Sequence, residues 1–327
     1  MKKRIILSGS DFADVPEKAG GGESKFMFTG ILCGLAAAFC NSLGFLVSAK
    51  CMKICSNPIR FLVYAHVWMM ILTLPLVWFF LPEGGIAELR AFLKAMFCFM
   101  FVFFAGQGMF FMALRYFEAS KLSSLLGLKI IVLTLIYAFL KNSIPNLYQI
   151  LAIILSAFAA VMINWSGKGK ILTWGWIFVF AVLVCYSFSD INETAMVLSV
   201  RAGNVGIVQS ALCTLTCAYS ALGFCCLPGI FFFRFDRQLF LWTVPYAFLW
   251  LVSQIFLFCC FALVLPVFGN VILACRGMFS VLLGMILSMF GIRDLDAQIS
   301  KGQWILRAVA SLLMIGAIAL SSFAAMK

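Results

Sequence analysis

The sequence predicts an all-α integral membrane protein with ten transmembrane helices, arranged as two inverted five-helix repeats. The 327 residues are 64% hydrophobic and 11% charged, with a mean hydropathy of +1.09, whereas a soluble domain is about 45–50% apolar and about 25% charged. The apolar residues also fall into runs of about 20, the length at which a helix spans the hydrocarbon core. Runs of this length exclude the short alternating strands of a membrane β-barrel.

Residues that favour loops divide the chain into these runs. Pro82-Glu83-Gly84-Gly85 ends the second run, and Ser166–Lys170 separates the fifth from the sixth. The loops are short, so we expect no soluble domain between the helices. The predicted spans are residues 27–49, 59–81, 92–114, 120–140, 146–165, 171–196, 204–233, 239–264, 267–291 and 303–325.

The order of these spans predicts the domain organisation. Residues 1–26 are expected to form a flexible N-terminal tail, residues 27–165 a first five-helix repeat and residues 171–325 a second. An odd number of crossings in each half gives the two halves opposite orientations, which is the inverted-repeat arrangement of many secondary transporters.

Two cations lie where a membrane helix should carry none. Lys129 is central in Leu122–Leu140, and Arg276 is central in Pro266–Gly291. A central charge costs about 2.5–3.5 kcal/mol on insertion scales, so it normally faces a cavity. We therefore expect both side chains in one substrate-binding site at the midplane. The alternatives are a snorkelling or internally paired Lys129, and an Arg276 that pairs with an acid on another helix.

Two carboxylates in the sixth span are the natural partners for such a pair. Asp190 and Glu193 are three residues apart, so both can lie on one side of a helix. We predict a coupling or gating role for them, with Asp190 the more important because it lies deeper. The alternative is that both are carboxylates at the membrane interface.

Uncharged polar residues at similar depth complete the predicted substrate-binding set. A polar side chain at this depth either binds the substrate or makes a hydrogen bond between helices. Tyr186 is included as an aromatic wall. The predicted substrate-binding residues are Lys129, Arg276, Asn41, Gln107, Tyr186, Gln254 and Asn270.

Several short motifs resemble a known family. They are Ala113-Leu114-Arg115-Tyr116, then Ala119-Ser120 and Leu122–Leu126, together with the stretch from Asn41 through Lys50 and Pro58. The pattern is similar to the EamA-type repeat of the drug/metabolite transporter superfamily, over residues 27–325. The chain departs from the usual pattern in the fourth helix, where Lys129 and Ile130 occupy the region of a proline, and Asn142 and Ser143 that of a glutamate. The resemblance implies a transporter with both termini inside the cell.

We therefore expect a secondary-active transporter in the cell (inner or plasma) membrane, not an enzyme. Its substrate is a small polar metabolite with an anionic group, of the amino-acid, nucleotide-like or phosphate-ester type. The chain has no phosphate-binding Gly-rich loop ending in Gly-Lys-Ser/Thr, so transport would run by exchange or on an ion gradient. The alternatives are an integral-membrane lipid-modifying enzyme and a channel. A single histidine, His66, does not favour an enzyme, and the loops show no selectivity filter that would favour a channel.

The expected partners follow from composition. They are the substrate, a coupling ion or counter-substrate, and membrane lipids, with the protein a monomer or a homodimer. The formal charge of +12 is scattered over short loops, where it sets orientation and meets lipid headgroups, so no nucleic acid is expected. The 13 cysteines contain no Cys-x-x-Cys pair and act as small hydrophobes, so neither a metal nor a cofactor is expected.

Overall fold

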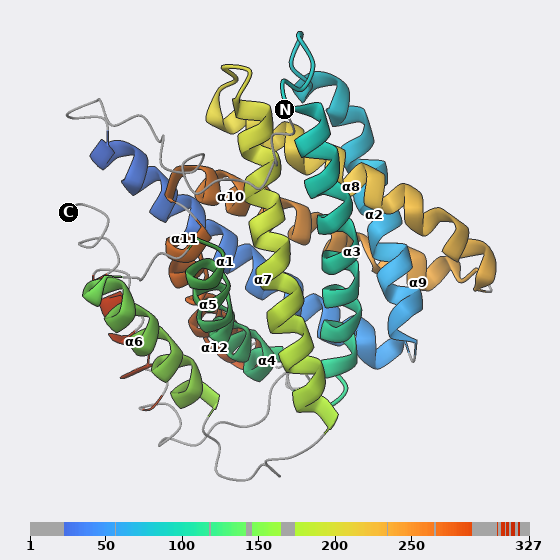
Figure 1. The fold of residues 1–327 in the computed structure, drawn as a ribbon. Coiled ribbons are helices and arrows are strands. Elements are labelled where there is room, and N and C mark those ends of the chain that lie inside the picture. The colour runs from blue at the N-terminus through green and yellow to red at the C-terminus, as the bar shows by residue number, and fades with distance from the viewer. Residues whose placement is uncertain are drawn as a thin grey trace.

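The computed structural model describes residues 23–55, 57–117, 119–141, 146–164, 174–233, 235–264 and 266–289, with isolated residues between 306 and 320. All regular elements in this part of the chain are helices, as the sequence predicts (Figure 1). The first 22 residues, most of the tenth predicted span and the residues Asn142 and Ser143 lie outside the described part.

Twelve α-helices and one short 3₁₀ helix make up the fold of the described residues. Helix α1 begins at Glu23, four residues before the first predicted span, and continues past its predicted end. The helices are α1 (Glu23–Ile54), α2 (Pro58–Phe80), α3 (Leu89–Ala113), α4 (Ala119–Leu125), η1 (Leu126–Leu128), α5 (Lys129–Lys141), α6 (Leu147–Asn164), α7 (Trp174–Arg201), α8 (Ile207–Phe232), α9 (Arg237–Trp242), α10 (Val244–Val264), α11 (Pro266–Leu273) and α12 (Arg276–Met289).

Seven helices or helix pairs of the described chain are long and apolar enough to cross a membrane. They correspond to seven of the ten predicted spans. The fourth predicted span is interrupted at η1, and the apolar stretch of α6 is short, so neither reaches this length as a continuous helix. The described helices thus support a multi-pass membrane protein, while the count of ten and the inversion of the halves stay predictions.

The start of α2 shows how local sequence sets a helix boundary. The side-chain oxygen of Asn57 accepts hydrogen bonds from the backbone N–H groups of Ile59 and Arg60, at 3.0 and 3.3 Å. Pro58 occupies the first helical position, where its missing N–H costs nothing. Asp236 caps α9 in the same way, accepting from the N–H of Leu239 at 3.1 Å.

Helices distant in sequence pack side by side across the centre. The most extensive contacts pair α3 with α7, α1 with α10 and α2 with α8, and α4 packs on α12. In Figure 1, α3 and α7 run next to each other through the middle of the view. The α2–α8 pair is close because Gly223 of α8 faces Met70 and the carbonyl oxygen of His66 on α2, an approach that only a small residue permits.

The connecting turns gather at two ends of the molecule. A Cβ on Gly203, which follows α7, would lie 3.3 Å from Ala87, which follows α2. At the other end, the Arg60 side chain near the start of α2 lies 3.8 Å from Asp236, which precedes α9. Figure 1 shows the first pair of turns at the top and the second pair toward the lower right. Turns that follow an even number of predicted crossings are thus together, and so are turns that follow an odd number.

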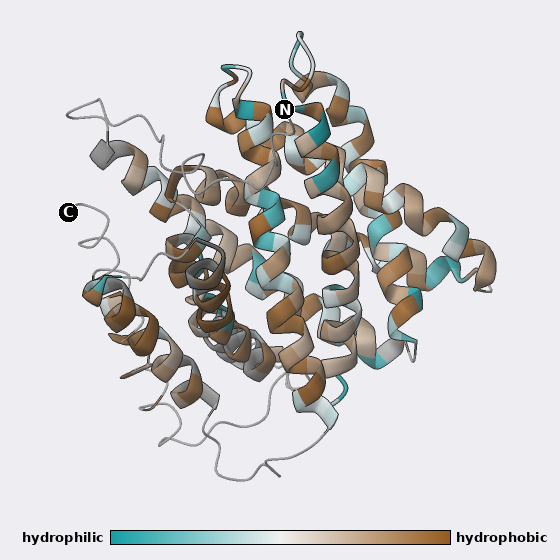
Figure 2. Cartoon of the chain, viewed as in Figure 1, coloured by the Kyte–Doolittle hydropathy of each residue, from teal (hydrophilic) through white to brown (hydrophobic). Residues whose placement is uncertain are grey.

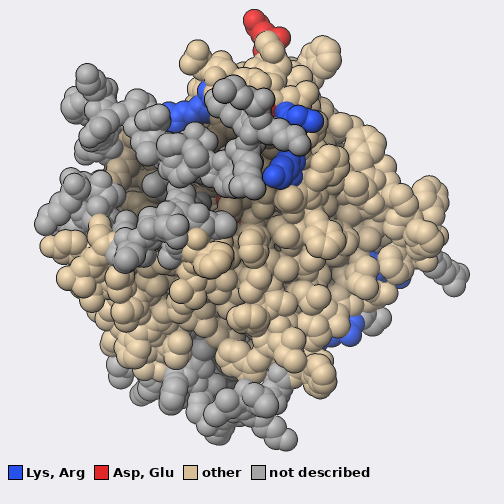
Figure 3. All heavy atoms as spheres, viewed as in Figure 1, with Lys and Arg blue, Asp and Glu red and all other residues tan. Residues whose placement is uncertain are grey.

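The outer surface is apolar. Trp78, Phe139, Phe231 and Phe232 expose 85–90% of their area, and the helices in Figure 2 are brown over most of their length. In Figure 3 the middle of the visible face is free of charge, and blue and red atoms lie toward its upper and lower-right margins. Such a contiguous apolar surface is what a lipid bilayer covers.

Candidate functional site

The fourth and ninth predicted spans are interrupted helices, and each central cation lies at the interruption. The 3₁₀ turn η1 separates α4 from α5, and Lys129 is the first residue of α5. A turn at Ala274 and Cys275 separates α11 from α12, and Arg276 is the first residue of α12. Helix interruptions at membrane depth are typical of transporter binding sites, where half-helix ends point toward the solute.

Lys129 belongs to a buried ion pair. Its Nζ lies 2.7 Å from Oδ2 of Asp190 on α7, and both side chains are only 4% exposed. Asn270 of α11 donates from Nδ2 to the same oxygen at 2.6 Å. The acid partner that the sequence suggested for Arg276 therefore pairs with Lys129 instead. This network joins the interrupted fourth and ninth spans through α7.

Arg276 is buried but has no ion pair among the described residues. Its Nε donates to the backbone oxygen of Ser123 on α4 at 3.3 Å, and the guanidinium lies 5.8 Å from the ring centre of Phe45. The backbone oxygen of Arg276 accepts from the hydroxyl of Ser42 at 2.8 Å. These contacts fix the start of α12, while no described carboxylate lies within 4 Å of the guanidinium nitrogens.

The four charged side chains surround one small cavity of about 20 Å³. This volume holds about one water molecule, so the cavity is too small for a metabolite in this conformation. Its lining comes from both halves of the chain: Asn41, Phe103, Lys129, Tyr186, Ser189, Asp190, Glu193, Trp250, Gln254, Leu257, Leu273 and Arg276.

Three polar atoms at this cavity have no hydrogen-bond partner in the described structure. They are Oδ1 of Asn41, the hydroxyl oxygen of Tyr186 and Oε1 of Glu193. Glu193 is 2% exposed, so water does not compensate its carboxylate from outside. Buried polar groups are nearly always satisfied, and each exception calls for an explanation. A polar ligand in an enlarged cavity would supply the missing partners.

The predicted substrate-binding residues mostly lie together. Five of the seven predicted substrate-binding residues line the cavity directly, together with both predicted coupling or gating residues, Asp190 and Glu193, and Asn270 reaches it through Asp190. Gln107 does not line it, because its Oε1 accepts from the hydroxyl of Tyr246 at 3.2 Å. This bond is an interhelical contact, the alternative that the sequence left open. The role of every residue in substrate binding stays a prediction. The five are Asn41, Lys129, Tyr186, Gln254 and Arg276.

Several lining residues were not among the predicted ones. Ser189 lies four residues before Glu193, so helical spacing from the two carboxylates could have found it. Leu257 follows Gln254 by three residues on α10 in the same way. Phe103 and Leu273 carried no signal, because each is one apolar residue within a long apolar run.

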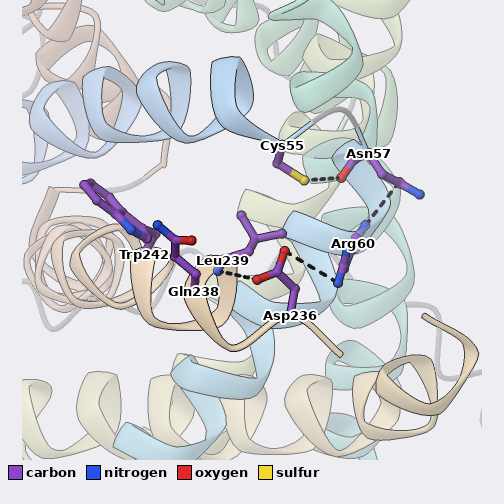
Figure 4. Close-up of a pocket in the computed structure, with 7 residues that line it drawn as sticks. All are labelled: Cys55, Asn57, Arg60, Asp236, Gln238, Leu239 and Trp242. Atoms are coloured by element: carbon purple, nitrogen blue, oxygen red, sulfur yellow. Dashed lines mark hydrogen bonds and ion pairs between the residues drawn. The ribbon is translucent and has the colours of Figure 1, made fainter. Parts of the chain in front are cut away.

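A second pocket of about 300 Å³ lies at the end of the molecule where α2 and α9 begin (Figure 4). Arg60 and Asp236 face each other across it, and the Tyr64 hydroxyl accepts from Arg60 Nε and from the Asp236 N–H, at 3.3 and 3.1 Å. Trp242 closes one side. The residues that line it are Cys55, Asn57, Arg60, Asp236, Gln238, Leu239 and Trp242.

Aromatic side chains fill the interior on α10 between these two pockets. Trp242 lines the outer pocket and Trp250 the central cavity, with Tyr246 four residues from each. Tyr246 packs against Phe61, Phe111 and Trp250, with ring centres 5.2–5.8 Å apart. Aromatic residues at four-residue spacing on α9 and α10 thus lead from the outer pocket to the central cavity.

The described residues hold no cluster of metal ligands, and all 13 cysteines are free. Most lie buried or half-buried among apolar side chains, as expected for cysteines that pack as small hydrophobes.

Comparison with protein families gives a match for part of the chain. Residues 28–165 match the model of the EamA-like transporter family. This part of the chain is EamA-like. The resemblance predicted from the sequence is confirmed over residues 28–165, and the EamA-like match supports the coarser functional prediction of a multi-pass membrane protein that transports small molecules. No curated protein matches the chain in sequence.

One solved structure, titled "Crystal structure of protein", is similar over 93% of this chain and 98% of its own, with a TM-score of 0.55 and 16% identity. At that identity the likeness concerns the fold alone. The shared fold covers nearly the whole chain, including residues outside 28–165.

Proposed function

We propose that the protein is a secondary-active transporter of a small polar metabolite that carries an anionic group. It would work by alternating access in the cell (inner or plasma) membrane, by exchange or coupled to an ion. The substrate site is the central cavity, opened by a movement of the two halves, residues 27–165 and 171–325. The EamA-like match supports the transporter class.

The pairing of helices supports two related halves. Counting the interrupted helices as single spans, the halves correspond by a shift of five spans. Exchanging the two halves turns the α3–α7 contact into the α10–α1 contact. The same exchange maps the α2–α8 contact onto itself, and likewise the contact of the fourth span (α4) with the ninth (α12). A two-fold exchange of inverted repeats produces this pattern, with the site where the halves meet.

The observation that carries the anionic substrate is Arg276. A buried guanidinium without a carboxylate partner is costly, and its planar fork matches the oxygens of a carboxylate or phosphate. It lies at the N-terminal end of α12, where the helix dipole adds positive potential. Lys129 supports the site indirectly, because Asp190 already neutralises it.

The test is exchange of labelled organic acids and phosphate esters in proteoliposomes that contain the purified protein. Arg276→Ala should lower exchange by at least about tenfold, the effect of losing one charged hydrogen bond. Arg276→Lys should recover part of it, because lysine keeps the charge but loses the fork.

The matched control is Arg90→Ala, an exposed arginine near the start of α3. It should exchange at the wild-type rate. Wild-type exchange by a folded Arg276→Ala variant would reject Arg276 as the anion ligand, and absence of exchange by the wild-type protein with every solute would reject the transporter itself.

A further inference from the structure

The charges around the central cavity define the substrate more narrowly. Two cations, Lys129 and Arg276, and two carboxylates, Asp190 and Glu193, line it. Lys129 and Asp190 contact each other at 2.7 Å. One cation and one carboxylate therefore remain without an ion pair among the described residues.

The two remaining groups differ in sign and lie on different helices. Arg276 begins α12, and Glu193 lies in the C-terminal half of α7. Both are at most 3% exposed, and Oε1 of Glu193 accepts no hydrogen bond from the described chain. The cavity thus presents a donor fork and an acceptor carboxylate to whatever enters it.

From this inventory we infer that the site takes a zwitterion, a solute with both an acid group and a protonated amine. This inference rests on the proposed function and deepens it. The acid group binds Arg276, and the amine donates to the free oxygen of Glu193. Tyr186 and Asn41, whose oxygen atoms also lack partners, accept the remaining N–H groups of the amine.

Electroneutrality gives the physical reason. By formal charge, the two cations and the two carboxylates sum to zero. A lone anion would leave a net negative charge in a buried site, and such a charge is costly at membrane depth. A zwitterion satisfies both unpaired groups and leaves the buried site neutral, and each new contact joins opposite charges.

The experiment compares matched solutes by the melting temperature of the purified protein, which rises when a ligand binds the folded state. The parents are leucine, serine and 2-aminoethyl phosphate. Each is tested beside the analogue without its amine (4-methylpentanoate, 3-hydroxypropanoate and ethyl phosphate) and the analogue without its acid group (3-methylbutylamine, ethanolamine and ethylamine). At least one parent should bind about 10- to 100-fold more tightly than both of its analogues, a charged hydrogen bond lost in each case.

Two variants test which residue binds the amine and which binds the acid group of the solute. Glu193→Gln should weaken the parent about 10- to 100-fold while leaving the amine-free analogue unchanged, and Arg276→Gln should weaken both. Glu83→Gln, an exposed glutamate in the turn after α2, is the matched control and should bind as the wild type does.

Three outcomes would overturn the inference. If the amine-free analogues bind and exchange as well as the parents, the site takes simple anions and the proposed transporter stands. If the acid-free analogues bind as well as the parents, Arg276 does not bind the acid group of the solute. If no parent shifts the melting temperature, the zwitterion assignment fails, and exchange of other organic anions then decides the fate of the proposed function separately.

Discussion

Lys129 and Asp190 lie in the centre of the protein, each within hydrogen-bond distance of the other's charge. Desolvation of two charges is costly, so such a pair adds little net stability, but removal of one partner leaves the other buried and unpaired. We predict that Lys129→Ala and Asp190→Ala each destabilise the protein by about 3 kcal/mol. The double variant should lose less than the sum.

The measurement is thermal unfolding of the four proteins in detergent, treated as a double-mutant cycle. Strict additivity would mean that the two charges do not stabilise each other. The same series separates structure from recognition, because the surviving Lys129→Ala protein should still bind substrate through Arg276. Loss of all binding in that folded variant would make Lys129 a direct ligand, as the sequence alone suggested.

At the scale of elements, the fit between α2 and α8 depends on Gly223. A methyl group at this position would approach the carbonyl oxygen of His66 to 2.6 Å and would also collide with Met70. Gly223→Ala should therefore destabilise the protein by about 1–3 kcal/mol, as overpacking does. It should do so although alanine favours the helical backbone by about 1 kcal/mol.

Gly108 of α3 is the matched control for this prediction. An added methyl group there would meet nothing closer than Leu62 at 3.8 Å, an ordinary contact. Gly108→Ala should therefore leave the melting temperature unchanged or raise it. An equal effect of the two substitutions would show that helix propensity, rather than the α2–α8 contact, decides stability at Gly223.

At the scale of the whole molecule, the turns predict how the chain threads the membrane. The turns at Gly84 and Gly203 lie together at one end, and Asn57 and Asp236 lie together at the other. A protease site inserted at residue 84 or 203 should be cut from one face of sealed vesicles only. A site at residue 57 or after Asp236 should be cut from the opposite face only.

Vesicles of both orientations provide the internal control, because each inserted site must become accessible in one of them. Cleavage at residues 84 and 57 from the same face would contradict this threading. It would also remove the basis for inverted halves, since those require an odd number of crossings in each half.

Much of the site could be predicted because depth along a membrane helix follows from counting residues. Asn41, Lys129, Tyr186, Gln254 and Arg276 were selected for their central positions, and they line one cavity. The depth of a residue along a helix does not determine the direction in which its side chain faces. Gln107 lies at a suitable depth, but α3 turns it toward Tyr246, because a helix that is apolar on every side carries little pattern to set its facing direction.

The sequence by itself determined the membrane class, the approximate spans and the depth of the charged residues, since each depends on local composition and length. The tertiary structure decided which charges neutralise one another. Asp190 pairs with Lys129, 61 positions earlier, and not with Arg276. The reason is that helix rotation and the interruptions at η1 and at Ala274–Cys275 determine where each side chain is placed. Contacts between distant helices are fixed only when the whole bundle packs. That Arg276 and Glu193 have no ion pair within the described part of the chain therefore follows from the fold and not from any stretch of the sequence.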